Sequence, residues 1–275
     1  MNSLRGYLTL FTFLAVSFSV FPQYDSVLYT IKKIERVNKN CPPKNRDRAS
    51  GCTEAILIWP EITGSTNNAV AQVVIERLRA DIALKTHQFF ISGGFAKSPE
   101  EVPAAFVREI DADREKWGMT NLPLNYRREI QVLFNSEYIF SIGTYEGGYT
   151  GGVHSNYLRT VFNYSLITGQ LLSLDYIFPR DQMEELFTVA EKFFRKAYDL
   201  PEEGSINEQG FWFPDNKFYL SNEFFPSKDG ITFIYNPYEI APYSEGEMRL
   251  FLPYYAITKY ISSWGPLKHH APPEQ

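Results

Sequence analysis

The sequence has few cysteines and histidines, and it lacks an excess of basic residues. Among its 275 residues are two cysteines and four histidines, and 27 basic residues stand against 32 acidic ones, a formal net charge of −5. Proteins that bind nucleic acid carry a clustered basic excess, so this balance argues against such a partner. Neither G-x-S-x-G nor H-E-x-x-H occurs in the chain. We therefore expect no metal and no cofactor, and no catalytic residue is indicated by a motif.

Long apolar runs are also missing, except at the N-terminus. Arg5 precedes an apolar run over residues 7–21. One positive charge followed by about 15 apolar residues is typical of a secretory signal peptide, whereas a membrane-spanning helix needs roughly 20. We expect residues 1–22 to be a signal peptide, with an uncleaved anchor helix as the alternative. Removal of the signal peptide leaves 26 basic and 32 acidic residues, a charge of about −6. We expect the mature protein to be periplasmic or extracellular and to have no membrane span.

The two cysteines lie close together in the sequence. Cys41 and Cys52 flank a polar insert rich in turn-forming residues. In an oxidising compartment we expect them to form a disulfide, which stabilises the fold by about 3 kcal/mol through loop closure. A zinc site is the weaker alternative, because it needs two more ligands and the nearest histidine is His87.

Hydrophobic periodicity predicts an α+β fold with antiparallel sheets and packed helices. Two helices are expected between the second and third strands, one capped by residues 64–66 and one beginning at 98–101 with Phe106, Ile110 and Trp117 buried. A third helix, residues 181–198, carries a capping box of Asp181 and Glu184. A short helix is expected at 254–264. The strands are expected at residues 27–37, 55–62, 128–135, 138–144, 158–164, 217–222, 231–235 and 248–252.

The polar residues 266–275 are expected to form a disordered tail.

Two loop segments carry the candidate binding residues. The first, YEGGYTGGVHSN at residues 145–156, combines four glycines with aromatic side chains, and glycine permits positive φ and close backbone approach. The alternative is a structural bulge in which His154 bonds to a neighbouring carbonyl. The second, at residues 235–246, places aromatic and acidic side chains in one compact loop. Together they nominate Tyr145, Gly151, Gly152, His154, Asn156, Tyr238, Glu239 and Tyr243 as a binding surface.

Three blocks in this order resemble a known family. YEGGYTGGVHSN, NYSLITGQLLSLDYIF at 163–178 and YEIAPYSEG at 238–246, followed by LPY at 252–254, resemble the extracellular domain shared by the lysozyme-sensing anti-sigma factor RsiV and the accessory region of the peptidoglycan deacetylase PdaC. The resemblance covers most of residues 29–261 and is strongest after Tyr145. It implies an α+β fold with two subdomains. Residues 24–145 would form an N-terminal hairpin–helix subdomain similar to PdaC, and residues 146–265 a C-terminal sheet–helix subdomain similar to RsiV. The cytoplasmic segment of an anti-sigma factor and the H-x-x-x-H pair of a deacetylase have no counterpart here, so we expect the sensing or accessory domain alone.

Residues and resemblance together predict a secreted or periplasmic module of the cell envelope. Its partner would be a cell-wall glycan or a basic glycan-cleaving protein such as lysozyme, which the acidic surface would attract. The alternative is an envelope-polymer hydrolase or deacetylase that uses His154 with Glu239 or Asp175. A purely structural envelope protein is a third possibility.

Overall fold

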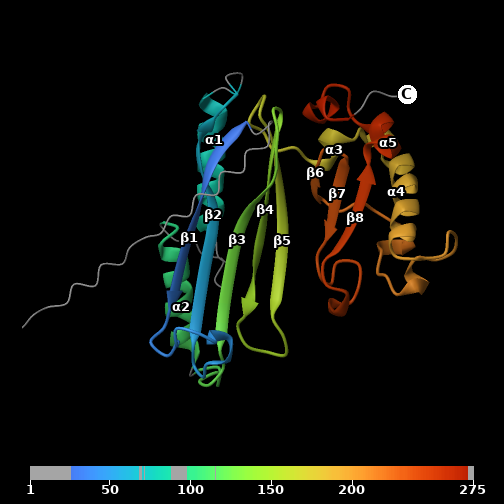
Figure 1. Cartoon of the computed structure of the whole chain (residues 1–275). Helices are drawn as coiled ribbons and strands as arrows, with labels where there is room; N and C mark the ends of the chain where they lie inside the picture. The colour runs from blue at the N-terminus through green and yellow to red at the C-terminus, as the bar shows by residue number, and fades with distance from the viewer. Residues whose placement is uncertain (1–25, 68–69, 71, 88–97, 115, 272–275) are drawn as a thin grey trace, which may run out of the picture.

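The computed structural model describes residues 26–67, 70, 72–87, 98–114 and 116–271. The expected signal peptide, residues 1–22, lies outside them. The described chain forms two β-sheets with helices packed on each, which confirms the α+β class (Figure 1). In the described ranges, no helix has the length and apolar character needed to cross a bilayer.

The first sheet contains β1 to β5 in sequence order. Its strands are β1 (Val27–Val37), β2 (Thr53–Ser65), β3 (Leu124–Asn135), β4 (Ile139–Tyr149) and β5 (Asn156–Ser165). Every neighbouring pair is antiparallel except β2 and β3, which are parallel. The expectation of purely antiparallel sheets is therefore wrong at this pair. The helical segment between β2 and β3 returns the chain to the same end of the sheet, as a parallel pair requires.

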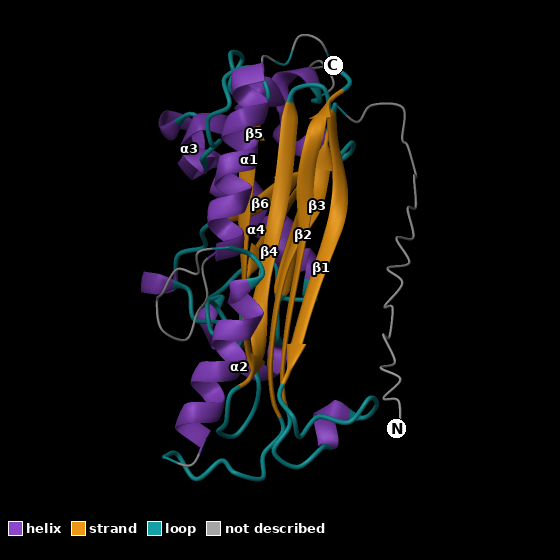
Figure 2. Ribbon diagram, turned by 90° about the vertical axis from the view of Figure 1, so that its left-hand side faces the viewer, coloured by secondary structure: helices purple, strands orange, loops and turns teal. Residues whose placement is uncertain are grey.

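Two helices cover one face of this sheet. They are α1 (Gln72–His87) and α2 (Glu101–Arg114), and Figure 2 shows both on the same side of the strands. Val74, Leu78 and Phe106 belong to the core beneath them. The prediction that Trp117 is buried is wrong. Helix α2 ends at Arg114, and the indole of Trp117 is 63% exposed in the following turn. The predicted cap at 64–66 is also wrong, since Ser65 still belongs to β2.

The second sheet has the order β6-β7-β8 and is antiparallel. It consists of β6 (Glu223–Pro226), β7 (Gly230–Tyr235) and β8 (Met248–Pro253). Three helices accompany it: α3 (Leu174–Ile177), α4 (Met183–Ala197) and α5 (Tyr254–Ile257). Phe194 of α4 lies at the centre of its core, with Phe211, Phe213 and Phe218 around its ring.

Several predicted elements differ in this C-terminal half. Residues 217–222 bury Phe218 and Leu220 in alternation, but the strand that pairs with β7 begins only at Glu223. Asp181 lies in a 3₁₀ turn, Arg180–Gln182, and α4 begins at Met183 without a side-chain cap. The helix expected at 254–264 ends as α-helix at Ile257.

The C-terminal tail is ordered as far as the structure describes it. A 3₁₀ helix, Pro266–His269, buries Leu267 in the second core. His270 contacts the β3–β4 turn through Ser136. The disorder predicted for 266–275 is thus wrong for residues 266–271, because their apolar side chains have a core to join. Residues 272–275 lie outside the described residues.

The change from one sheet to the other falls after Ser165. β4 and β5 pair from Ile139 to Gly148 and from Asn156 to Ser165, so residue 145, the expected subdomain boundary, lies inside a continuous ladder. The side of the first sheet without helices carries alternate side chains of β3, β4 and β5, among them Arg127, Tyr145 and Tyr157. This open face leads to the junction with the second sheet.

Candidate functional site: an aromatic cluster at the junction of the two sheets

The β4–β5 hairpin and the β7–β8 connection meet at one end of the open face. Tyr145 belongs to β4, His154 to the turn, and Tyr157 to β5. Tyr238 and Tyr243 come from the connection between β7 and β8. We call these five side chains the aromatic cluster.

The four tyrosine rings form one continuous row, in the order Tyr145, Tyr157, Tyr243 and Tyr238, and His154 stacks on Tyr243. The Tyr145 and Tyr157 ring centroids are 5.7 Å apart, and Tyr157 meets Tyr243 at 6.3 Å. Tyr243 stacks on His154 at 4.0 Å with planes 20° apart, and Tyr238 lies 5.4 Å from Tyr243. Separations of this size are typical of favourable aromatic pairs.

Hydrogen bonds hold the row in place. His154 Nδ1 lies 2.8 Å from the Ser155 carbonyl, and its Nε2 lies 3.4 Å from the Tyr238 hydroxyl. The contact with the carbonyl requires that Nδ1 is the donor, since a carbonyl oxygen only accepts. The Tyr243 hydroxyl donates to the same Ser155 carbonyl, and Glu247 N donates to the Tyr157 hydroxyl at 3.0 Å. The two chain segments are therefore fixed to each other through the aromatic side chains.

Charged side chains flank the row. The Arg159 guanidinium lies 5.8 Å from the centroid of the Tyr145 ring, and its Nε is 2.6 Å from a Glu247 carboxylate oxygen. The other Glu247 oxygen accepts from Arg249. Burial, the largest influence, raises the pKa of the Tyr145 hydroxyl above its ordinary value. At neutral pH Tyr145 is therefore a neutral phenol beside a cation–carboxylate pair.

Side-chain hydrogen bonds in both directions join β5 to the C-terminal half. Glu223 accepts from Val161 N, and Asn163 Nδ2 donates to the Phe224 carbonyl at 2.7 Å. Burial raises the pKa of Glu223, although the hydrogen bond from Val161 N opposes the shift. These bonds fix the junction next to the aromatic cluster.

The structure brings together part of the predicted site. Tyr145, His154, Tyr238 and Tyr243 lie in the aromatic cluster. Among the remaining predicted residues, Gly151 and Gly152 have φ of 103° and 101° in the adjacent turn, and Asn156 is exposed at the start of β5. His154 makes the carbonyl contact of the structural alternative, yet its ring is exposed and stacked.

The carboxylates of the hydrolase alternative are engaged elsewhere. Glu239 accepts from Asn236 N at 2.8 Å and from the Tyr219 hydroxyl at 3.3 Å. Asp175 pairs with Ser173 and Arg180, whose hydrogen bonds lower its pKa. Neither residue is a hydrogen-bond partner of His154 in the described structure. Among the described residues, no group of three or more His, Cys, Asp or Glu side chains is placed so that it could hold a metal ion.

Four residues of the site were missed from the sequence: Tyr157, Arg159, Asn236 and Glu247. Tyr157 and Arg159 could have been predicted from the sequence. The register of the β4–β5 hairpin places Arg159 opposite Tyr145, so Tyr157 and Arg159 both lie on the same face of the sheet as Tyr145. Asn236 and Glu247 depend on how the two sheets dock, for which no local signal exists.

Comparison with known proteins finds one family model that matches a segment of the C-terminal half. Residues 175–255 match DUF3298, a family described as a protein of unknown function. This segment supplies Tyr238, Tyr243 and Glu247, whereas Tyr145, His154 and Tyr157 precede it. No curated protein matches the sequence.

Two solved structures share the fold over nearly their whole length. A DUF3298 family protein from Bacteroides fragilis has a TM-score of 0.70 and 20% identity, covering 90% of this chain and 98% of that one. One from Pseudomonas aeruginosa has a TM-score of 0.63 and 16% identity, covering 87% and 96%. At these identities the likeness concerns the fold alone.

Proposed function

We propose that this protein is an exported module of the cell envelope that binds a cell-wall glycan on the aromatic cluster. The observation that carries the proposal is the continuous row of four tyrosines, with one histidine stacked on it, contributed by both halves of the chain. The apolar leader, the Cys41–Cys52 disulfide and the resemblance to envelope sensing and accessory domains support an extracellular or periplasmic setting.

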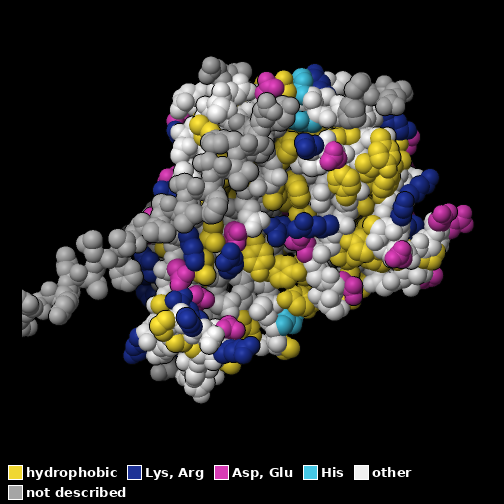
Figure 3. Space-filling view, in the orientation of Figure 1, with side chains coloured by type: hydrophobic (Ala, Val, Ile, Leu, Met, Phe, Trp, Pro, Cys, Tyr) yellow, Lys and Arg dark blue, Asp and Glu magenta, His cyan; other side chains and the backbone are white. Residues whose placement is uncertain are grey.

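Aromatic rings and planar charged groups suit a sugar ligand. The C–H face of a pyranose ring packs on an aromatic ring, while its hydroxyls require donors and acceptors nearby. Tyr238 is 55% exposed, and Arg159 and Glu247 lie beside the row. Hydrophobic side chains gather on this face of the molecule where the two halves meet (Figure 3).

Local charge favours a glycan over a basic protein such as lysozyme. The net charge of the chain is negative, which attracts a basic partner at long range. Next to the aromatic cluster, however, Arg159 and Arg249 accompany Glu247, so this patch is not an acidic one. The hydrolase alternative is weaker, because Glu239 and Asp175 are bonded to other residues.

Calorimetric titration with a peptide-free oligosaccharide of the cell wall tests this proposal. We expect measurable binding by the parent protein and about tenfold weaker binding by Tyr243→Ala, because the ring joins both halves of the row. Tyr255→Ala is the matched control, since Tyr255 is 82% exposed on α5 outside the aromatic cluster. Absence of oligosaccharide binding, or an equal loss in both variants, would contradict the proposal.

A further inference from the structure

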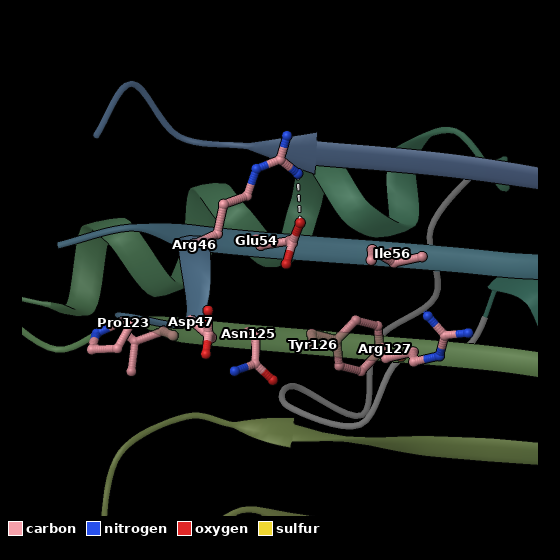
Figure 4. A pocket seen from close by; sticks show the side chains of 9 residues that line it. Arg46, Asp47, Glu54, Ile56, Pro123, Asn125, Tyr126 and Arg127 are labelled. Atoms are coloured by element: carbon pink, nitrogen blue, oxygen red, sulfur yellow. Dashed lines mark hydrogen bonds and ion pairs between the residues drawn. The ribbon is translucent and has the colours of Figure 1, made fainter. Parts of the chain in front are cut away.

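A pocket of about 320 Å³ lies on the open face, beside the disulfide loop (Figure 4). Its lining includes Arg46, Asp47, Glu54, Ile56, Asn125 and Arg127. These residues come from the disulfide loop, β2 and β3. None of them belongs to the aromatic cluster.

The disulfide loop forms one wall of the pocket. Its 3₁₀ helix, Arg46–Arg48, lies against the sheet, where Arg46 bonds to Glu35 and Glu54. The hydrogen bond from Arg46 lowers the pKa of Glu35, and the bond to Glu35 is the largest cause that raises the pKa of Arg46. The wall is therefore held by a disulfide at its base and by charged hydrogen bonds at its tip.

Two donors of the opposite wall have no partner in the described part of the chain. Arg127 uses Nε and Nη2 for Glu129 and leaves Nη1 unbonded. Asn125 Oδ1 accepts from Tyr149 N, which leaves the Asn125 Nδ2 hydrogens unbonded. The free Nη1 of Arg127 is well suited to a carboxylate, because charge-assisted bonds from a guanidinium are short and strong.

Acceptors and an apolar side chain complete the lining. Asp47 and the Glu54 oxygen that is not bonded to Arg46 offer acceptors, and Ile56 contributes apolar surface. A ligand with a carboxylate, an amine and a short aliphatic part would match Arg127, these acceptors and Ile56. Short peptides that include a diamino acid have this chemistry.

Strand register connects the pocket with the aromatic cluster. Arg127 pairs with Gly147, and Gly147 pairs with Tyr157. Since neighbouring strands lie about 4.8 Å apart, the backbones of Arg127 and Tyr157 are roughly 10 Å apart on one face. Gly147 carries no side chain, so none rises from the sheet between them.

We propose that this pocket binds a peptide attached to the glycan. The sugar would lie on the aromatic cluster and the carboxylate of its peptide would reach Nη1 of Arg127. The ligand class is therefore a glycopeptide of the cell wall. The sugar part of this inference rests on the proposed function.

Three probes separate the pocket from the aromatic cluster: a peptide-free oligosaccharide, a muropeptide containing the same sugars, and the free stem peptide. We expect the parent protein to bind the muropeptide about tenfold more tightly than the oligosaccharide, as one added charge-assisted contact allows. Arg127→Gln should abolish this difference and leave oligosaccharide binding unchanged. The control Arg108→Gln, which replaces an exposed arginine on α2, should retain the difference.

The outcomes distinguish the two proposals. Equal affinity for muropeptide and oligosaccharide, or an unchanged difference in Arg127→Gln, overturns the peptide pocket and leaves the glycan proposal standing. If the oligosaccharide does not bind, the glycan proposal fails and the free peptide decides the pocket. Peptide binding that is lost in Arg127→Gln then supports the pocket, and absence of peptide binding overturns it.

Discussion

The side-chain amide of Asn236 completes the backbone hydrogen bonding of Arg159. Asn236 Oδ1 accepts from Arg159 N at 2.7 Å, and Asn236 Nδ2 donates to Arg159 O at 2.9 Å. Because β5 is the last strand of its sheet, these two groups have no neighbouring strand to bond with. The amide thus takes the place of a peptide group from a further strand. It joins the two halves of the molecule beside the aromatic cluster.

Replacing Asn236 by alanine should weaken the junction. The variant leaves the N–H and C=O of Arg159 without their partner, so we expect the free energy of unfolding to fall by about 1–3 kcal/mol. Denaturant titration measures the change. Asn222→Ala is the matched control, because that side chain is exposed and forms no hydrogen bond with the described residues. Equal stability of the two variants would show that the Asn236 amide does not hold the junction.

Gly147 is required for the position of Tyr157. A Cβ atom at residue 147 would lie 2.5 Å from Tyr157 Cβ and 2.8 Å from the Asn156 carbonyl oxygen. We expect Gly147→Ala to displace β5 locally, to cost about 1–3 kcal/mol of stability and to weaken glycan binding. Gly64→Ala is the control, since no atom lies within 4 Å of the Cβ it would add. Calorimetric melting and oligosaccharide titration report both effects, and a Gly147→Ala protein indistinguishable from the control contradicts this role.

Local sequence patterns predicted the positions of the strands better than the way in which the strands pair. The alternation in residues 27–37 and the turn at 135–137 predicted β1 and the β3–β4 hairpin, because sequence-adjacent partners leave a local signal. The parallel pairing of β2 with β3 has no such signal, since helices separate the two strands. Residues 217–222 alternate like a strand, but burial of Phe218 and Leu220 alone produces that pattern.

The candidate site was predictable only in part for the same reason. Each loop could be chosen for its glycines and aromatics, and four of the chosen side chains lie together. The roles of Glu239 and Asn236 depend on contacts made across the fold. Glu239 accepts hydrogen bonds from the Tyr219 hydroxyl and from Asn236 N, so a carboxylate predicted to bind a ligand has a structural role.

Removing the disulfide should loosen the wall of the pocket. Cys41 and Cys52 are 11 residues apart and form the predicted bond. Replacing both by serine should lower the free energy of unfolding by about 3 kcal/mol, mainly because the unfolded chain gains freedom. The loop would also hold Arg46 less firmly, so muropeptide affinity should fall while oligosaccharide affinity is retained. Reductant should lower the free energy of unfolding of the parent protein and leave that of the double variant unchanged. If the fully reduced parent protein is as stable as the oxidised one, the prediction is contradicted.

His270 should make the contact between the C-terminal tail and the β3–β4 turn dependent on pH. Its Nε2 lies 3.0 Å from Ser136 Oγ, and its ring packs edge-on against Phe134 at 5.2 Å. Burial lowers the pKa of His270, the neighbouring His269 lowers it further, and Glu137 opposes the shift. The folded protein therefore favours the neutral imidazole.

The sign of the effect follows from proton uptake. Between the lowered pKa of His270 and its unfolded value of about 6.5, the unfolded chain binds more protons than the folded one. The contribution of neutral His270 to stability is complete above the pKa of the unfolded state. It is lost as the pH falls through the lower pKa of the folded state. Melting temperatures measured from pH 8 to pH 5 should thus decrease less steeply for His270→Gln than for the parent protein. His154→Gln, which replaces an exposed histidine of the aromatic cluster, serves as the control for the loss of an imidazole. A pH profile of His270→Gln that parallels the parent would rule out this coupling, because a purely structural contact would change stability equally at every pH.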